Sequence, residues 1–278
     1  MKIWVITKKT GILLAIVIIS VLALVLIGRG RAITVSNPQR DLPIYSVRLP
    51  ENEKRVAISF DAAWGNEDTQ QLIDILAKHN VKATFFVVGG WVDNFPESVK
   101  ALSDAGHEVM NHSNTHPHMT QLSPDKMKEE VESCSEKIEK VTGVKPTLFR
   151  APYGDYNNDV VRTMREAGYF TVQWDVDSLD WKDLSANEIC ERVLTKTKPG
   201  SIILFHNAAK HTPEALPTIL EKLQEDGYEI VPISQLILKE NYAIDQAGTQ
   251  YSTSETPESS AAPSASPDTA SPAPTQAQ

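Results

Sequence analysis

The sequence predicts an α/β fold: a distorted or incomplete (β/α) barrel of about seven parallel strands, with an N-terminal transmembrane helix and a disordered C-terminal tail. Three observations support this prediction. The middle of the chain alternates short β-rich runs with amphipathic stretches, the N-terminal region is almost entirely apolar, and the C-terminal region is rich in Ser, Thr, Pro and Ala. We therefore expect an anchor at residues 1–31, a lead-in linker at 32–54, a folded domain at 55–240 and a tail at 241–278.

The overall composition excludes several classes of protein. The chain has 278 residues, of which 41% are hydrophobic and 23% charged, as in ordinary globular proteins. Its net charge of −9 argues against a phosphate-binding surface, so we expect no nucleic-acid partner. Two cysteines cannot build a disulfide scaffold or a cysteine zinc cluster. We expect a monomer.

Residues 11–28 form a nearly continuous apolar stretch that is broken only by Ser20. At about 1.5 Å rise per residue, a helix of this length reaches roughly 27 Å and spans a slightly thinned bilayer. Lysines precede the stretch, and Arg29 and Arg31 follow it. The positive-inside rule then favours a single-pass protein of the cell membrane, with a cytoplasmic N-terminus and an extracytoplasmic folded domain. A cleaved signal peptide is the alternative, but the stretch is long and residues 28–31 are a poor cleavage site.

The C-terminal segment has a different composition from the rest of the chain. From about residue 247 onward it shows no apolar periodicity. Such a segment cannot bury enough apolar surface to offset its chain entropy, so we expect it to be disordered.

The elements of the central region follow one another in order. Helical spacing of Leu72, Ile73 and Leu76 marks the first helix, while Ser123 caps the third and Gly143 ends it. Strands are predicted at residues 56–60, 83–88, 107–110, 147–149, 169–174, 201–205 and 229–232, and helices at 66–79, 95–105, 124–141, 158–167, 185–197 and 213–226. This length suits an incomplete barrel better than the full eightfold one, which takes about 250 residues. A doubly wound open sheet is the alternative, although no G-x-G-x-x-G follows the first strand.

Residues capable of chemistry cluster directly after the predicted strands. Parallel βα folds place their sites at the carboxyl ends of strands, so we expect these residues to converge on one pocket. They are Asp61, His112, His116, Arg150, Asp175, Asp177, Asp180, Trp181 and His206.

Several of these residues have a candidate role. His112 and His116 lie four residues apart, a spacing that turns two imidazoles toward one metal ion if the segment makes a helical turn. His206 is a candidate general acid, or alternatively a packed histidine bonded to the backbone. Asp61 suits a general base, and Arg150 would hold it ionised.

Other histidines and tryptophans have weaker claims. His79, His107, His118 and His211 lack acidic strand ends beside them and are interpreted as structural or solvent-exposed. Trp64 and Trp91 suit either stacking on sugar rings or packing in the core. Cys134 and Cys190 are interpreted as free thiols on helices.

Five segments, in this order, resemble the motifs of the polysaccharide deacetylases, also called the NodB-homology domain or carbohydrate esterase family 4. They are Ser59-Phe-Asp-Ala-Ala63, His112-Ser-Asn-Thr-His116, Arg150-Ala-Pro-Tyr-Gly154, Asp177-Ser-Leu-Asp-Trp181 and Ile202-Ile-Leu-Phe-His206. The Phe-Asp-x-x-Trp-Gly form of the first segment looks most like the sporulation-linked branch of Gram-positive bacteria.

The resemblance implies removal of N-acetyl groups from a cell-wall glycan, most plausibly peptidoglycan. A divalent metal, usually zinc, would be held by His112 and His116 and would polarise the acetamide carbonyl. Asp61 would match the base that activates water, oriented by Arg150. His206 would match the acid that protonates the departing amine, with Asp177 orienting or tuning it. The backbone N–H of Tyr153 would help to hold the oxyanion. Apart from the resemblance, the position of Trp181 beside Asp177 and Asp180 suits a wall for the substrate or a role in orienting the histidine.

One position departs from the family pattern. The usual first motif has two consecutive aspartates, of which the second is a metal ligand, and here the second is Ala62. A catalytic zinc ordinarily has three protein ligands and a water. The third contact therefore comes from Asp61, Glu67 or Asp68, or the metal is weakly bound or absent.

Three functional hypotheses follow. The first is a membrane-anchored, metal-dependent deacetylase, which accounts for Asp61, Arg150, Asp177 and His206. The second is a catalytically impaired glycan-binding protein that keeps the deacetylase fold, which Ala62 favours. A glycosidase with paired carboxylates is the third, but it leaves the two histidines without a role.

Overall fold

A computed structural model describes residues 40–254, and the elements named below belong to this part of the chain. The predicted membrane anchor and the tail beyond residue 254 lie outside it. Among the described helices, none combines the length and apolar character needed to cross a membrane.

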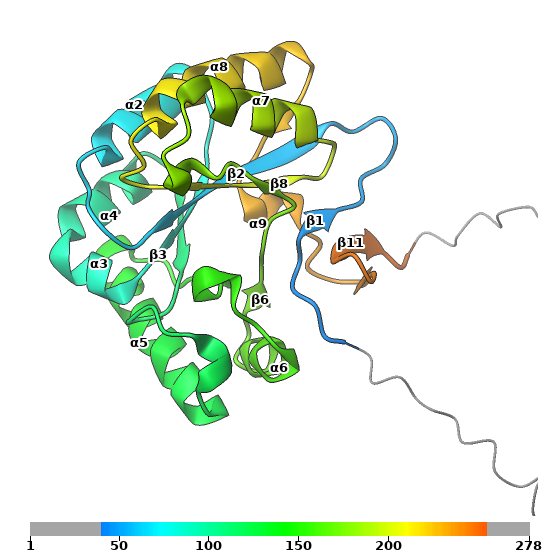
Figure 1. Ribbon diagram of the computed structural model, residues 1–278. Helices are drawn as coiled ribbons and strands as arrows, with labels where there is room; N and C mark the ends of the chain where they lie inside the picture. Colours follow the sequence, from blue (N-terminus) through cyan, green and yellow to red (C-terminus); the bar gives the residue numbers. More distant parts are fainter. Residues whose placement is uncertain (1–39, 255–278) are drawn as a thin grey trace, which may run out of the picture. The chain divides into compact units, whose positions relative to one another are not determined.

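A parallel sheet forms the centre of the described domain (Figure 1). Its strand order is β6-β5-β4-β3-β2-β8-β7, and every neighbouring pair runs parallel. A short further strand, β9, pairs with the first residues of β2. The strands are β2 (Arg55–Ala62), β3 (Thr84–Val87), β4 (Glu108–Asn111), β5 (Leu148–Phe149), β6 (Phe170–Thr171), β7 (Val176–Asp177), β8 (Ile202–His206) and β9 (Glu229–Ile230). Because β6 and β7 occupy opposite edges, the predicted incomplete barrel is confirmed.

Helices connect most of these strands and cover the sheet (Figure 1). They are α2 (Thr69–Lys78), α3 (Gly89–Asn94), α4 (Pro96–Asp104), α5 (Pro124–Thr142), α6 (Asn158–Glu166), α7 (Ala186–Lys196), α8 (Thr212–Glu225) and α9 (Ile233–Leu236). The caps predicted for α5 are confirmed: the Ser123 side chain accepts a hydrogen bond from the Lys126 amide, and Gly143 ends the helix with a φ of 74°.

Side chains of β2 alternate between two hydrophobic clusters, as the pleat of a strand requires. Val56, Ile58, Phe60 and Ala62 share one cluster with buried residues of α2, α4, α7 and α8. Ala57 belongs to the other cluster, with Phe86 of β3 and Ile202 of β8. Ser59 and Asp61 have the same parity as Ala57, so the strand places Asp61 on the face opposite to the helix-packed Ala62.

A second, three-stranded sheet lies beside the open seam of the barrel. It has the order β1-β11-β10, formed by β1 (Ser46–Val47), β10 (Tyr242–Ile244) and β11 (Thr249–Ser252). The segment leading into β1 connects both sides of the seam, because Ile44 bridges to Val172 after β6, and Ser46 bridges to Ser201 before β8.

Close approach at this seam requires a glycine. The Val47 amide donates a 2.9 Å hydrogen bond to the Gly200 carbonyl. A Cβ atom at Gly200 would lie 1.7 Å from the Val47 carbonyl oxygen, and its φ of 84° is left-handed. Both features exclude a larger residue without movement of the backbone.

Two sequence predictions need correction. The strand predicted at residues 169–174 is confined to Phe170–Thr171, and a separate strand, β7, carries Asp177 to the other edge of the sheet. Residues 242–252 form the β10–β11 pair and are not part of a disordered tail. Their polar sequence is held by a buried side chain, since Gln250 accepts a hydrogen bond from the Leu238 amide and donates one to the Leu238 carbonyl.

Candidate active site

The residues predicted to carry the chemistry do lie together at the carboxyl ends of the strands. Asp61 and His206 are paired Cα partners on the neighbouring parallel strands β2 and β8. Both line one cavity together with His112, His116 and Asp177. The geometric expectation that distant segments deliver these side chains to one pocket is therefore confirmed.

Asp61 forms a buried ion pair with Arg150. Arg150 Nη1 donates a 2.7 Å hydrogen bond to Asp61 Oδ1, and its Nη2 donates to Ser59 Oγ at 2.9 Å and to the Gln173 carbonyl at 3.1 Å. The Arg150 side chain is fully buried. This fixed guanidinium leaves Asp61 with its second oxygen, Oδ2, for other partners.

The pKa of Asp61 lies below its ordinary value. Burial alone would raise the pKa, but the charge of Arg150, with further contributions from His112 and His206, lowers it by more. Asp61 is therefore a carboxylate at neutral pH, the form that a general base requires.

The two histidines of the second motif lie side by side in a loop after β4, whereas the sequence argument required a helical turn. His112 Nδ1 lies 2.8 Å from the Arg150 carbonyl, which turns Nε2 to within 3.6 Å of Asp61 Oδ2. His116 has a left-handed φ of 61°, and its amide donates to Ser113 Oγ at 3.0 Å. The ring centroids are 5.0 Å apart.

Both imidazoles are neutral at physiological pH. Burial lowers the pKa of His112, and burial together with the neighbouring His112 lowers the pKa of His116 to about 4. Neutral imidazole is the form that binds metal.

The donor set is nevertheless incomplete for a catalytic zinc. His116 Nδ1 is buried without a hydrogen-bond partner, as a nitrogen awaiting a ligand would be. However, within residues 40–254 there is no group of three His, Cys, Asp or Glu residues arranged to hold a metal ion. Position 62, where a third ligand is expected, is a buried alanine. Two imidazoles alone do not match the three-ligand site, and we derive no step through a cation.

Two of the alternative third ligands, Glu67 and Asp68, do not line the cavity that holds the histidines. Asp68 is buried, and its Oδ2 accepts a 2.9 Å hydrogen bond from the Ala208 amide. Glu67 Oε2 accepts from the Asn66 amide at 3.0 Å. Both carboxylates therefore serve the loops around the cavity. Asp61 alone of the three lines the cavity with the histidines.

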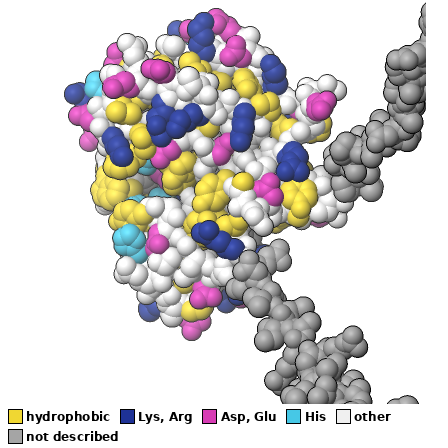
Figure 2. Space-filling view, turned by 45° about the vertical axis from the view of Figure 1, so that its right-hand side comes forward, with side chains coloured by type: hydrophobic (Ala, Val, Ile, Leu, Met, Phe, Trp, Pro, Cys, Tyr) yellow, Lys and Arg dark blue, Asp and Glu magenta, His cyan; other side chains and the backbone are white. Residues whose placement is uncertain are grey.

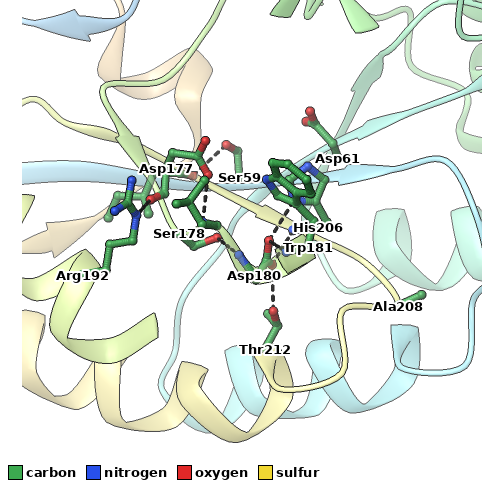
Figure 3. A network of polar contacts seen from close by, with 12 residues as sticks. Ser59, Asp61, Asp177, Ser178, Asp180, Trp181, Arg192, His206, Ala208 and Thr212 are labelled. Atoms are coloured by element: carbon green, nitrogen blue, oxygen red, sulfur yellow. Dashed lines mark hydrogen bonds and ion pairs between the residues drawn. The ribbon is translucent and has the colours of Figure 1, made fainter. Parts of the chain in front are cut away.

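His206 is held by Asp180 through two hydrogen bonds (Figure 3). Nδ1 of the ring lies 2.8 Å from Asp180 Oδ1, and the His206 amide donates to Asp180 Oδ2 at 2.8 Å. Thr212 Oγ1 also donates to Asp180 Oδ2 at 2.7 Å. Asp180 is thus a buried carboxylate that binds the end of β8 and the start of α8, and its Oδ1 also accepts a 2.9 Å hydrogen bond from the Trp181 amide.

The orienting role expected for Asp177 therefore belongs to Asp180. Asp177 Oδ1 accepts a hydrogen bond from the Leu179 amide at 2.8 Å, and its backbone carbonyl accepts from Arg192. These bonds shape the turn that carries Asp180 to His206. Spacing along one motif cannot distinguish two aspartates three residues apart, since only the fold of the turn decides which one points at the ring.

The pKa of His206 is raised. Burial lowers it, but the hydrogen bond and charge of Asp180, with smaller contributions from Asp61 and Asp177, raise it by more. His206 consequently holds a proton more readily than an ordinary histidine, as a general acid must.

Aromatic side chains form the walls of the cavity. The cavity has a volume of about 550 Å³, and Trp64, Tyr153, Trp174 and Trp181 line it. Trp64, Tyr153 and Trp181 are 68%, 60% and 58% exposed. Figure 2 shows histidine and hydrophobic side chains around a hollow on the surface of the domain. Trp91, by contrast, is buried and donates from Nε1 to the Gly65 carbonyl, so it belongs to the core.

A second cavity of about 350 Å³ adjoins the first and shares Trp64, Trp181, His206 and Asn207 with it. The two form a groove that continues past His206. Asn207 was not anticipated from the sequence, and its side chain donates to the carbonyls of Trp64 and Gly65, both at 2.8 Å. Its position directly after His206, at the end of a predicted strand, could have identified it as a candidate site residue.

Asp175 does not join this site, because its carboxylate accepts hydrogen bonds from Ser201 Oγ and the Ile202 amide, both at 2.9 Å. Cys134 and Cys190 are free thiols, as expected.

Known proteins resemble this chain over its folded domain. The family model for polysaccharide deacetylase matches residues 48–172. The uncharacterized protein YlxY of Bacillus subtilis is 35% identical over 70% of this chain and 60% of its own length. A peptidoglycan-N-acetylglucosamine deacetylase of Bacillus cereus is 33% identical over 69% of this chain and 71% of its own. Other relatives are named peptidoglycan-N-acetylmuramic acid or N-acetylglucosamine deacetylases, and the chain spans about 40 to 60% of the length of several of these relatives.

A solved structure is similar as well. BA3943 of Bacillus anthracis, described as a pseudoenzyme of carbohydrate esterase family 4, is 39% identical and superposes with a TM-score of 0.67, covering 70% of this chain and 68% of that one. A mutant of BA3943 with restored enzymatic activity is similar to the same degree, with 40% identity and a TM-score of 0.67.

Proposed function

Because the chain belongs to the polysaccharide deacetylase family, we propose that it hydrolyses N-acetyl groups of a cell-wall glycan, with the amino sugars of peptidoglycan as the substrate class. One observation carries this proposal. A carboxylate and a protonatable imidazole, each with its own charge partner, lie at paired positions on β2 and β8 and face the same cavity.

The proton transfers follow from these partners. Asp61 accepts a proton from the water that attacks the acetamide carbonyl carbon, since Arg150 keeps it ionised. His206 gives a proton to the amide nitrogen as the C–N bond breaks, and acetate and a free amine leave. Asp180 holds the ring through Nδ1, so that Nε2 is the nitrogen left for the substrate.

The groove supports a polymeric substrate. Exposed indole rings of Trp64 and Trp181 line both cavities, as does His206. The apolar faces of sugar rings pack on such flat aromatic surfaces, and water is displaced from both. We infer that neighbouring sugars of a glycan occupy the two cavities.

Zinc is the cation we propose for His112 and His116, because imidazole ligands suit zinc better than magnesium or calcium. With two protein imidazoles and Ala62 in place of a carboxylate, binding is expected to be weak.

A second function is favoured by Ala62 and by the similarity to BA3943. In this case the protein binds the glycan in the same groove without turning it over. The N-terminal apolar stretch supports our further proposal that either function is exercised at the outer face of a cell membrane.

Acetate release tests the proposal. The purified protein is incubated with N-acetylated glycan strands without metal, with added zinc, and with a chelator, beside the Asp61→Asn variant and the surface control Asp74→Asn. If the protein is a deacetylase, wild type and Asp74→Asn should release acetate, and Asp61→Asn should not. If all three proteins release acetate only at the background rate and still bind the glycan, the result would instead support the binding function.

A further inference from the structure

We propose that His118 is a positioning residue, which holds Tyr153 in place at the rim of the cavity. This inference rests on the proposed function, and on the oxyanion-binding role that the family resemblance implies for the Tyr153 amide. His118 lies outside the five motifs, and the sequence analysis interpreted it as structural or solvent-exposed. In the structure its imidazole stacks on the Tyr153 ring, with centroids 4.4 Å apart and planes inclined by 23°.

Tyr153 needs external support because its backbone is strained. Its φ of 60° and ψ of 7° are left-handed, a conformation that costs energy in a residue with a Cβ atom. The side chain is also 60% exposed, so burial in the core does not hold it. Two backbone hydrogen bonds close the turn, from Gly154 N to the Ala151 carbonyl and from Asp155 N to the Pro152 carbonyl, and contacts of the exposed ring add to them.

Two histidines from the loop after β4 provide these contacts. His116 meets the Tyr153 ring edge to face at a centroid distance of 4.5 Å, and His118 stacks on it. Tyr153 thus lies between an imidazole that faces the cavity and one that faces outward. Aromatic pairs of this geometry are worth more than their buried area alone.

His118 is itself fastened to the loop that carries Tyr153. Its Nδ1 lies 3.5 Å from Asp155 Oδ2, and the same oxygen accepts hydrogen bonds from the Thr120 amide at 3.1 Å and from Thr120 Oγ1 at 2.7 Å. Asp155 therefore ties the loop after β4 to the loop after β5 directly behind the aromatic stack.

The consequence concerns the amide of Tyr153. The next two amides are used within the turn, since Gly154 N donates to the Ala151 carbonyl and Asp155 N to the Pro152 carbonyl. The Tyr153 N–H donates to no atom of residues 40–254, so it is free to bind an oxygen of the substrate. Its direction depends on the left-handed φ that the stack with His118 maintains.

Three variants test this role. His118→Ala removes the ring, His118→Phe keeps a ring that can stack, and His79→Ala is a control at the far end of α2. Acetate release is measured as kcat and KM. In parallel, the 19F spectrum of protein labelled with 3-fluorotyrosine reports on Tyr153, with the signal assigned by Tyr153→Phe.

We expect His118→Ala to lower kcat about tenfold with KM changed by less than about twofold, since the oxyanion contact is made in the transition state. The Tyr153 resonance should shift or broaden. His118→Phe should restore both readouts. An unchanged resonance and kcat in His118→Ala, or equal impairment in His118→Phe, overturns the proposal. If wild type releases no acetate, the proposed function fails, and the fluorine signals alone decide the positioning role.

Discussion

The Asp180 carboxylate forms two hydrogen bonds with His206: one oxygen lies 2.8 Å from the ring nitrogen Nδ1, and the other accepts from the backbone amide at 2.8 Å. The ring is thereby fixed in orientation, and its proton is stabilised by a charge that is itself buried. The same carboxylate accepts a hydrogen bond from Thr212 Oγ1, so it also connects the end of β8 to the start of α8.

Replacement of this carboxylate should shift the pH dependence of acetate release. A general acid must be protonated, so activity declines as pH rises through the pKa of His206, which Asp180 raises. In Asp180→Asn we expect this decline at lower pH and kcat reduced by about tenfold or more. Asp177→Asn, which removes a charge that does not touch the ring, should produce a smaller shift. Identical profiles for the two variants would contradict the assignment.

Acid denaturation should reveal the buried pair of Asp61 and Arg150. The folded-state pKa of Asp61 is lowered, so its contribution to stability is fully present above its unfolded value of about 4 and is lost as pH falls through the folded value. Asp61→Asn leaves Arg150 buried without a counter-charge, which typically costs about 3–5 kcal/mol. We expect a lower Tm at neutral pH and a flatter dependence of Tm on pH below about 4 in this variant. A variant whose Tm falls in acid as steeply as that of wild type would assign the linkage to other groups.

The Ala62→Asp substitution should lower the stability of the metal-free protein and raise its affinity for zinc. Ala62 is 1% exposed within the cluster that packs against the helices, so a carboxylate there is costly without a cation. We expect a lower Tm than wild type in chelator and a larger rise of Tm with added zinc, because the ion would draw the new carboxylate to His112 and His116. Ala62→Asn, similar in size but uncharged, is the control. No gain in zinc-dependent Tm over this control would mean that position 62 cannot reach the histidines.

Glycan binding should depend on the exposed indoles. Trp64→Ala and Trp181→Ala are each expected to weaken the affinity for a chitin oligosaccharide about tenfold, or ~1.4 kcal/mol. Val144→Ala, an exposed apolar residue outside the groove, is the control. Calorimetry with oligosaccharides of increasing length would also show whether both cavities are occupied, since affinity should then rise beyond a single sugar.

Gly200→Ala should destabilise the fold beyond the cost of its backbone conformation. A left-handed φ typically costs about 1 kcal/mol in alanine. Gly168→Ala has this cost alone, because its φ is 87° and no atom lies within 4 Å of an added Cβ. At Gly200 the added atom meets the Val47 carbonyl oxygen. Unfolding in urea should therefore give a clearly larger loss of free energy for Gly200→Ala, and equal losses would show that the lead-in segment moves aside freely.

Strong local signals in the sequence predicted the alternating elements correctly. Apolar periodicity located α2, and capping residues located both ends of α5. The two-residue strand β7 was missed, because pairing with β8 rather than composition makes it a strand. The left-handed backbone conformations of His116 and Tyr153 could not be predicted from the sequence either, because the contact between their rings joins residues of different loops. For the site, residue types at strand ends predicted the pocket, but the choice of Asp180 over Asp177 needed the turn between them.

The fastening of the barrel seam by Ile44 and Ser46 has a mechanical consequence. Residues 44–46, which precede the first long strand, connect the segment after the edge strand β6 to the residue before β8. A force applied to the chain at Arg40 would therefore act on these two bridges before it reaches β2. A recombinant domain that begins at Arg55 would lack both bridges, so such a fragment should begin no later than Asp41.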